Sequence, residues 1–181
     1  MGYRGTWVAV RGDRLEEALR VVGLRVEATL EEAQYDPGHW AVVMPGPWCV
    51  VFGDGSDAMF TVRRKHAKEL SAGSEALFFT CNDTTMCAEL ECWRDGRLSW
   101  SIVHDGSEGR TSPTLTGEPP PIVHETIAAL REEERAAGDD GVDYLYEAAP
   151  VVGLALTGFR HDQTLSNGDV LPIFALAPTR G

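Results

Sequence analysis

The stretch 88–102, which reads Ala-Glu-Leu-Glu-Cys-Trp-Arg-Asp-Gly-Arg-Leu-Ser-Trp-Ser-Ile, constrains the fold more than any other part of the chain. Pairing it across a two-residue turn at 95–96 places Glu91 opposite Trp100, which mixes polar and apolar side chains. A loop longer by one residue places Leu90 opposite Trp100 and sorts the two kinds of side chain onto separate faces. Because a one-residue slip exchanges the faces of a sheet, the sorted register is expected. The sequence therefore predicts an antiparallel hairpin with one apolar and one acidic face.

The sorted register also fixes the end of this hairpin. It places Cys92 opposite Leu98 across a three-residue loop, 94–96. Such a loop needs a residue in the left-handed conformation, and Gly96 stands where that residue is required.

Strand-like and helix-like patterns follow one another along the whole chain, and no linker or internal repeat divides it. Before the hairpin, the patterns predict a strand at 6–10, a helix at 13–22, an irregular connection at 25–38, strands at 40–44 and 48–52, a helix at about 57–72 and a strand at 76–81. After the hairpin, they predict a short strand near 114, a helix after 119–121 and a helix on either side of Pro150. A last strand at 170–174 and a frayed end from 175 complete the predicted order. This order predicts one α+β domain over residues 1–181, with a mostly antiparallel sheet and helices packed on one face. The runs 40–44 and 48–52 are apolar almost throughout, which indicates strands covered on both faces near the centre of the sheet.

Acidic residues outnumber basic residues by 28 to 16, which gives a formal net charge of −12. This excess argues against nucleic acid or an anionic membrane as the main partner, because both repel an acidic protein. The excess is greatest at 118–147, where nine acids are set against two arginines. The one cationic run, 63–68, is predicted to be the solvated face of a helix. No stretch approaches the roughly 20 apolar residues of a membrane span, and the N-terminus lacks a secretory pattern, so a cytoplasmic location is expected.

The four cysteines are expected to be reduced thiols that pack as small apolar side chains. Cys81, Cys87 and Cys92, together with His104, are of the ligand types that zinc prefers. No Cys-x2-Cys spacing occurs, however, and positions 87 and 92 fall on opposite faces of one strand. We therefore expect no metal site, and the sequence indicates no other cofactor.

Two His-Asp pairs, His104-Asp105 and His161-Asp162, are the candidates for catalysis. A small hydrolase acting on a phosphate or ester would use His104, Asp105, Arg160 and His161, with His104 as the base and Arg160 as an anion clamp. That chemistry requires the four side chains to converge in one pocket. Without convergence, each pair is expected at a strand end or in a loop.

Three segments resemble landmarks of an uncharacterised family of small acidic bacterial cytosolic proteins: Trp48-Cys-Val-Val-Phe52, the stretch 92–105, and Leu156-Thr-Gly-Phe-Arg-His-Asp162. In size and acidity the chain is also similar to immunity proteins of bacterial toxin systems. The resemblance implies a bacterial, cytosolic, single-domain protein and no catalytic residues.

The sequence therefore predicts a non-catalytic protein-binding module whose acidic surface engages a basic partner, of the immunity type where that partner is a bacterial toxin. An exposed aromatic ringed by charges is typical of an interface anchor. The expected contact residues are Trp93 with its neighbours on the acidic face of the hairpin and the acidic run further along: Glu89, Glu91, Arg97, Glu132, Glu133 and Glu134. A small hydrolase, and a small-ligand sensor that uses the aromatic-rich sheet as a pocket wall, are the alternatives. The oligomeric state is left open.

Overall fold

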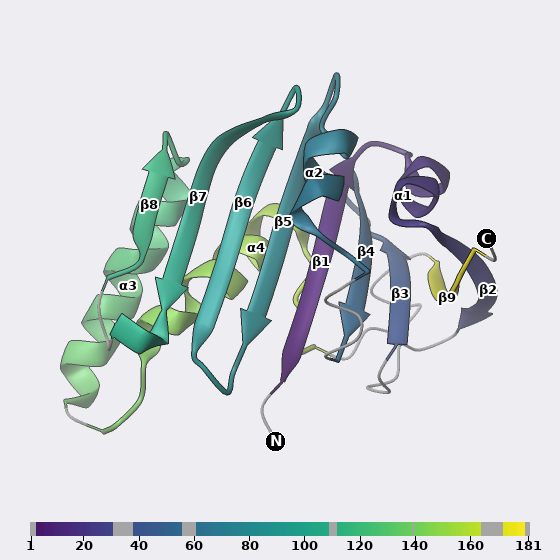
Figure 1. The fold of residues 1–181 in the computed structure, drawn as a ribbon. Helices are drawn as coiled ribbons and strands as arrows, with labels where there is room; N and C mark the ends of the chain where they lie inside the picture. The colour runs from purple at the N-terminus through teal and green to yellow at the C-terminus, as the bar shows by residue number, and fades with distance from the viewer. Residues whose placement is uncertain are drawn as a thin grey trace.

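The structure is a computed structural model that describes residues 3–30, 38–55, 61–108, 112–138, 140–163 and 172–179. The described residues form a nine-stranded antiparallel sheet with the order β2-β9-β3-β4-β1-β5-β6-β7-β8 (Figure 1). Its strands are β1 (Arg4–Arg11), β2 (Leu24–Leu30), β3 (Gly38–Val43), β4 (Trp48–Asp54), β5 (Glu75–Asn82), β6 (Cys87–Arg94), β7 (Arg97–Asp105), β8 (Thr114–Gly117) and β9 (Ile173–Pro178). The α-helices are α1 (Leu15–Val22), α2 (Arg64–Leu70), α3 (Pro121–Ala137) and α4 (Ala148–Thr157), and the 3-10 turns are η2 (Gly106–Glu108) and η3 (Tyr144–Glu147).

Strand β1 lies at the centre of the sheet, between β4 and β5. Its side chains alternate between two hydrophobic cores, with Trp7 and Ala9 in one core and Val8 and Val10 in the other. All four are at most 2% exposed. Trp7 stacks on Phe79 of β5, with 5.2 Å between the ring centroids. The centre of the sheet is therefore shielded from water on both faces.

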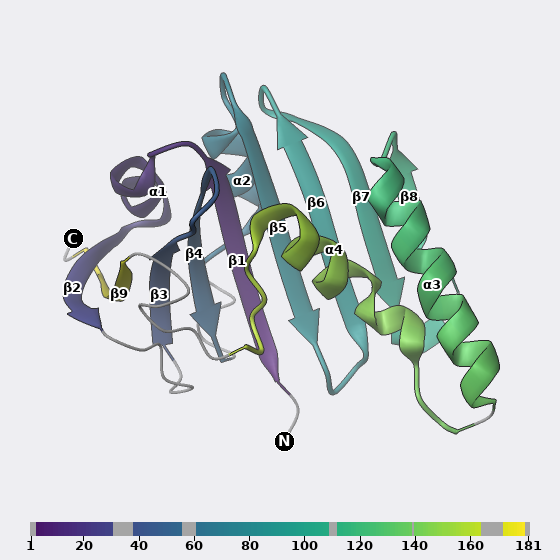
Figure 2. The ribbon, with the colours of Figure 1, turned by 180° about the vertical axis from the view of Figure 1, so that it is seen from behind.

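Helices cover both faces of this sheet, as the two opposite views show (Figures 1 and 2). Helices α1 and α2 pack on the core that contains Val8, whereas α3, η3 and α4 pack on the core that contains Trp7. The predicted α+β class and the antiparallel sheet are confirmed. The expectation that the helices would pack on one face is wrong, because strands that are apolar on both faces must be covered on both.

The β6–β7 hairpin sorts its side chains by face as predicted, but in a different register. Leu90 faces Ile102 and Cys92 faces Trp100, a shift of two residues from the predicted pairing. A shift of two residues returns each side chain to its own face, because the side-chain period of a strand is two. The apolar residues of both strands therefore still meet on the face covered by α3 and α4.

The end of the hairpin combines a tight turn with a bulge. Asp95 and Gly96 have φ values of 49° and 70°, which are typical of a two-residue type I′ turn rather than the predicted three-residue loop. Trp93 pairs with Leu98, and Ser99 is the extra residue before the register changes. The bulge thus corrects the one-residue mismatch that this turn would otherwise impose on both faces.

Two predictions for the outer strands are wrong. Part of the expected irregular connection, 25–38, is strand β2, and the expected frayed end contains most of β9, which runs to Pro178. The two strands pair with each other, so backbone hydrogen bonds hold β2 although five consecutive side chains of it are exposed. No hydrophobic alternation is needed for such a strand, and sequence patterning therefore missed it.

Helix α2 is shorter than the helix predicted for about 57–72. It begins at Arg64, and the predicted start at Ser56 or Asp57, with Met59, lies outside the described residues. His66 of the cationic run is buried, and its Nδ1 accepts the backbone N–H of Arg63 at 3.1 Å. The run is therefore only partly a solvated face.

The site-bearing face is built by α3, η3 and α4. Helix α3 starts at Pro121. Proline suits the first turn of a helix, because a backbone N–H at that position would have no intrahelical partner. The helix buries Val123, Ile127 and Leu130. After η3, the apolar helix α4 crosses the central strands, and a Cβ at Gly153 would lie 3.1 Å from Cζ2 of Trp7. Helix α4 ends at Gly158, whose φ of 75° turns the chain back over the sheet.

We predict that Gly117→Ala destabilises the protein more than Gly73→Ala. Both glycines have positive φ, so an alanine costs roughly 1 kcal/mol at either position. At Gly117 the new Cβ would also lie 2.0 Å from the carbonyl oxygen of Ser99 at the bulge, whereas nothing lies within 4 Å at Gly73. Urea unfolding should therefore show a larger loss for Gly117→Ala, by about 2 kcal/mol or more. Equal losses would mean that the contact at the bulge relaxes freely.

Candidate functional site

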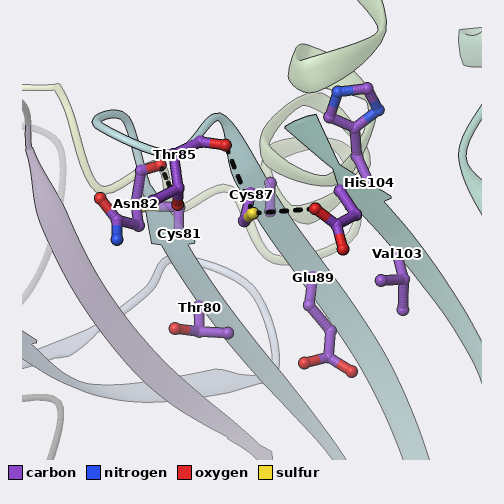
Figure 3. A pocket seen from close by; sticks show the side chains of 10 residues that line it. Thr80, Cys81, Asn82, Thr85, Cys87, Glu89, Val103 and His104 are labelled. Atoms are coloured by element: carbon purple, nitrogen blue, oxygen red, sulfur yellow. Dashed lines mark hydrogen bonds between the residues drawn. The ribbon is translucent and has the colours of Figure 1, made fainter. Parts of the chain in front are cut away.

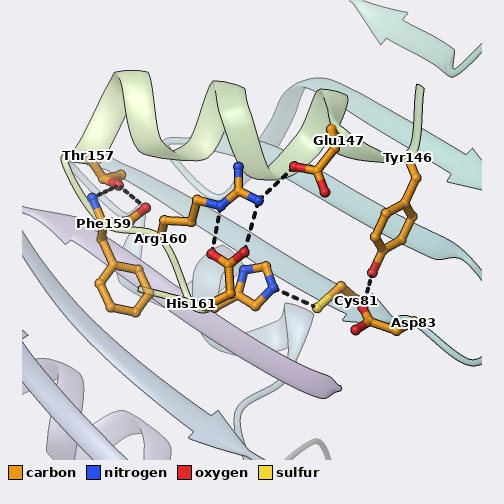
Figure 4. A network of polar contacts seen from close by, with 9 residues as sticks. Cys81, Asp83, Tyr146, Glu147, Thr157, Phe159, Arg160 and His161 are labelled. Atoms are coloured by element: carbon orange, nitrogen blue, oxygen red, sulfur yellow. Dashed lines mark hydrogen bonds and ion pairs between the residues drawn. The ribbon is translucent and has the colours of Figure 1, made fainter. Parts of the chain in front are cut away.

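A cavity of about 760 Å³ opens on the face of the sheet that carries α3 and α4. Its walls come from the N-terminal segment at Tyr3, the turn after β5, helix α3, turn η3 and the segment after α4. Figure 4 shows polar contacts made by residues that line it, among them Arg160 with Glu147 and Tyr146 with Asp83. Segments far apart in sequence thus meet at one place.

Arg160 is clamped by two carboxylates at the edge of this cavity. Its Nε and Nη2 donate to the two oxygens of Asp162 at 2.6 and 2.9 Å, and Nη2 also donates to Glu147 at 2.7 Å. These carboxylate contacts raise the pKa of Arg160 above its ordinary value. Thr157 helps to place the arginine, because its Oγ1 accepts the backbone N–H of the buried Phe159 at 3.0 Å. Arg160 is therefore held within the protein rather than free to bind a substrate anion.

His161 lies between two aromatic rings, Tyr3 at 4.7 Å and Phe79 at 5.0 Å between centroids. Burial lowers the pKa of His161 to about 4, so the imidazole is neutral at pH 7. Its Nε2 lies 3.5 Å from Sγ of Cys81, and burial raises the pKa of that thiol to about 12. The pair therefore stays as a neutral thiol and a neutral imidazole, which is the opposite of an activated cysteine.

Two further contacts fasten η3 to the sheet. The hydroxyl of Tyr146 donates to Asp83 at 2.5 Å, and this bond together with burial raises the pKa of Tyr146. Nε2 of His104 lies 2.9 Å from Asp143, which also accepts the backbone N–H of Tyr146. Nδ1 of His104 is buried with no hydrogen-bond partner among the described residues, and Nε2 is the ring nitrogen that donates to the Asp143 carboxylate.

The four residues of the hydrolase alternative do not converge. His104 is buried against η3, whereas Asp105, the next residue of β7, points to the opposite face, where Ser107 donates to it and lowers its pKa. Arg160 and His161 line the large cavity, but neither His104 nor Asp105 does. The alternation of side chains along β7 alone separates the base from its proposed partner.

Asp105 instead lines a smaller cavity of about 300 Å³ on the other face, at the ends of β5, β6 and β7 (Figure 3). Thr80, Asn82, Cys87 and Glu89 share this cavity. The Cys87 thiol donates weakly to Asp105 over 3.5 Å. His104 is also among the lining residues, but its ring is buried and bonds to Asp143. No lysine or arginine among the described residues lines this cavity, whose other polar groups are hydroxyls, thiols, an amide and carboxylates.

The predicted open acidic face of the hairpin is wrong. Glu91 is only 3% exposed, because α2 covers it and Arg64 donates to Glu91 through Nε at 3.0 Å and to Glu89 through Nη2 at 2.5 Å. Burial, followed by the charge of Glu91, raises the pKa of Glu89. Trp93 is half-buried against the α1–α2 core, and its Nε1 donates to Glu91 at 2.9 Å. This set is a packed ion-pair network under a helix, and of the predicted hairpin contacts only Arg97 is exposed.

The acidic run on α3 does face outward. Glu132 is exposed and pairs with Arg135 at 2.6 Å, Glu133 lines the large cavity, and Glu134 is half-buried. The cavity also receives Asp143 and Glu147, which belong to the acidic segment 118–147, and Asp83 and Asp162, which the sequence did not connect with that segment. Five carboxylates thus surround one cavity whose one arginine, Arg160, is already paired.

The described residues contain no group of three or more His, Cys, Asp and Glu side chains placed to hold a metal ion. The four cysteines are free thiols, and Cys49, Cys81 and Cys92 are buried. Within the described part of the chain, no helix has both the length and the apolar character that crossing a bilayer requires. Comparison of the sequence and the fold with protein-family models, curated proteins and solved structures finds no match.

We predict that Glu91→Gln and Glu89→Gln differ in stability at pH 7. Glu91 is almost fully buried and receives both Arg64 and Trp93, so neutralising it should cost about 1–2 kcal/mol of the free energy of unfolding. Because the pKa of Glu89 is raised in the folded state, its negative charge at pH 7 lowers the free energy of unfolding. Glu89→Gln should therefore change stability by less than about 0.5 kcal/mol in urea unfolding. A larger loss of stability for Glu89→Gln than for Glu91→Gln would mean that Glu89, and not Glu91, is the carboxylate that stabilises the fold.

We predict that His161 makes the protein less stable as the pH falls from 6.5 to 4.5. Its folded pKa of about 4 lies below the ordinary value of 6.5, so the unfolded chain takes up the proton first. The loss from this group alone amounts to about 2–3 kcal/mol at pH 4.5. His161→Phe keeps a ring between Tyr3 and Phe79 but cannot titrate. Urea unfolding at both pH values should show a weaker pH dependence for the variant, and an identical one would contradict the assignment.

Proposed function

We propose that this protein is a non-catalytic binding module for a basic protein, and that the cavity beside α3 and η3 is its contact site. The observation that carries the proposal is the charge of this cavity, which is lined by five carboxylates, one paired arginine and a neutral histidine. An enclosed excess of negative charge attracts cationic groups and raises the rate of encounter with a basic partner.

The surroundings of the cavity support a protein partner. Val142 at its rim is 49% exposed, the most exposed of the large hydrophobic side chains described. Glu132, next to Glu133 on α3, is an exposed carboxylate outside the cavity that pairs with Arg135. An apolar contact beside a charged hollow gives a partner both buried area and orientation.

A basic bacterial toxin is the partner class that we favour, with this protein acting as its immunity-type inhibitor. Support for this comes from the net charge of −12 and the small size of the chain. The residues of the hydrolase alternative are separated, since Asp105 and His104 face opposite sides of the sheet. Cys81 and His161 do meet, but burial keeps both neutral, and the neighbouring Arg160 is already paired with Asp162 and Glu147. A binding role accounts for the cavity without requiring that arrangement.

The test uses as its probe a basic protein encoded by a gene adjacent to that of this chain, and the absence of any such gene would count against the toxin assignment. Its dissociation constant should rise as salt is raised from roughly 50 to 300 mM, because salt screens exposed charges. Reversing two charges with Glu132→Lys and Glu133→Lys should weaken binding by about tenfold or more.

The matched control is the double variant Glu16→Lys and Glu27→Lys, which changes the net charge equally at exposed positions on α1 and β2. It should keep most of the wild-type affinity. Equal losses in the two double variants, or an affinity independent of salt, would overturn the proposed contact site.

A further inference from the structure

We infer that the cavity beside α3 and η3 admits an arginine side chain of the partner, in preference to a lysine side chain or a metal ion. This inference rests on the proposed function and specifies which chemical group the site takes. Its basis is the combination of flat aromatic walls with carboxylates that are spread around the cavity.

The spread of the carboxylates favours a large, delocalised cation. Five carboxylates line the cavity, yet no three acidic, histidine or cysteine side chains among the described residues are placed to hold a metal ion. A metal ion needs ligands that converge on one point at about 2–2.6 Å. A guanidinium carries its charge over a plane with five N–H donors, so it can reach carboxylates on different walls.

Glu133 and Glu147 are the carboxylates best placed to meet such a guest. Glu133 has no hydrogen-bond or ion-pair partner among the described residues, and it stands on α3 at one wall. Glu147, in η3, uses Oε2 for Arg160, and its side chain remains 37% exposed. The two acids belong to different elements, α3 and η3, so a cation that contacts both would be held from two parts of the lining.

The aromatic lining favours arginine over lysine. Tyr3, Tyr144 and Tyr146 line the cavity, and the Tyr3 ring packs on the His161 ring, with 4.7 Å between their centroids. Guanidinium groups stack on such rings and lose less hydration than an ammonium group does. His161 is neutral at pH 7, so it adds no charge that would repel the guest.

Arg160 shows the same chemistry inside the chain. Its guanidinium lies at the edge of the cavity and bonds to both oxygens of Asp162 and to one of Glu147. With that arginine fixed, the cavity keeps an excess of carboxylates over cations. A second guanidinium would offset this excess.

The experiment titrates the full chain with two capped peptides, hexaarginine and hexalysine, at about 150 mM salt, and follows the tyrosine and histidine signals by NMR. We expect hexaarginine to bind at least about fivefold more tightly than hexalysine and to shift the signals of Tyr144, Tyr146 and His161. Equal affinities, or shifts that avoid these residues, would overturn the preference for arginine.

A pair of variants on one helix separates the cavity from general charge. Glu133→Gln should weaken hexaarginine binding by about threefold or more, whereas Glu125→Gln, an exposed position of α3 away from the cavity, should change it much less. Equal effects would overturn the inference but leave a diffuse acidic binding surface standing. If neither peptide binds even at low salt, both the inference and the proposed function fail.

Discussion

The burial of both faces of the central strands is the constraint on which the rest of this structure depends. Strands β4, β1 and β5 have apolar side chains on both sides, so two separate layers of helix are needed to remove them from water. Once α1 and α2 cover one face, the helices after β8 must cover the other. That second layer brings η3 and the segment after α4 together over the sheet, and their edges form the acidic cavity.

Helix α2 covers the polar face of the β6–β7 hairpin, which explains why the alternation of polar and apolar residues did not leave the polar side chains exposed. Glu89 and Glu91 alternate with apolar residues as on a wet face, but Arg64 reaches them from the helix above. A charged side chain can be buried when a partner of opposite charge and further hydrogen bonds replace water. Trp93 supplies one of those bonds, so it belongs to the packing of this protein rather than to an exposed anchor.

Patterns within one element were predictable from the sequence, and contacts between distant elements were not. The faces of the β6–β7 hairpin and the C-terminal glycine of α1 follow from local periodicity and φ preferences. By contrast, the approach of Cys81 to His161 joins residues 80 apart, and that of Asp83 to Tyr146 joins residues 63 apart. No local signal marks such pairs, because they are set by where α4 crosses the sheet. For the same reason the sequence located the acidic segment 118–147 but not Asp83 and Asp162, which share the cavity with its carboxylates.

The extra residue at Ser99 allows the bulge and the turn of the hairpin to compensate each other in length. The register set by the two-residue turn and the register that sorts the side chains by face differ by one residue, and the bulge at Ser99 accommodates that difference. Deleting Ser99 while adding one residue to the turn would preserve every pairing from Cys92 downward, so the two changes compensate each other. The bulge and the turn can therefore replace each other during evolution, provided that the number of residues between Cys92 and Trp100 stays the same.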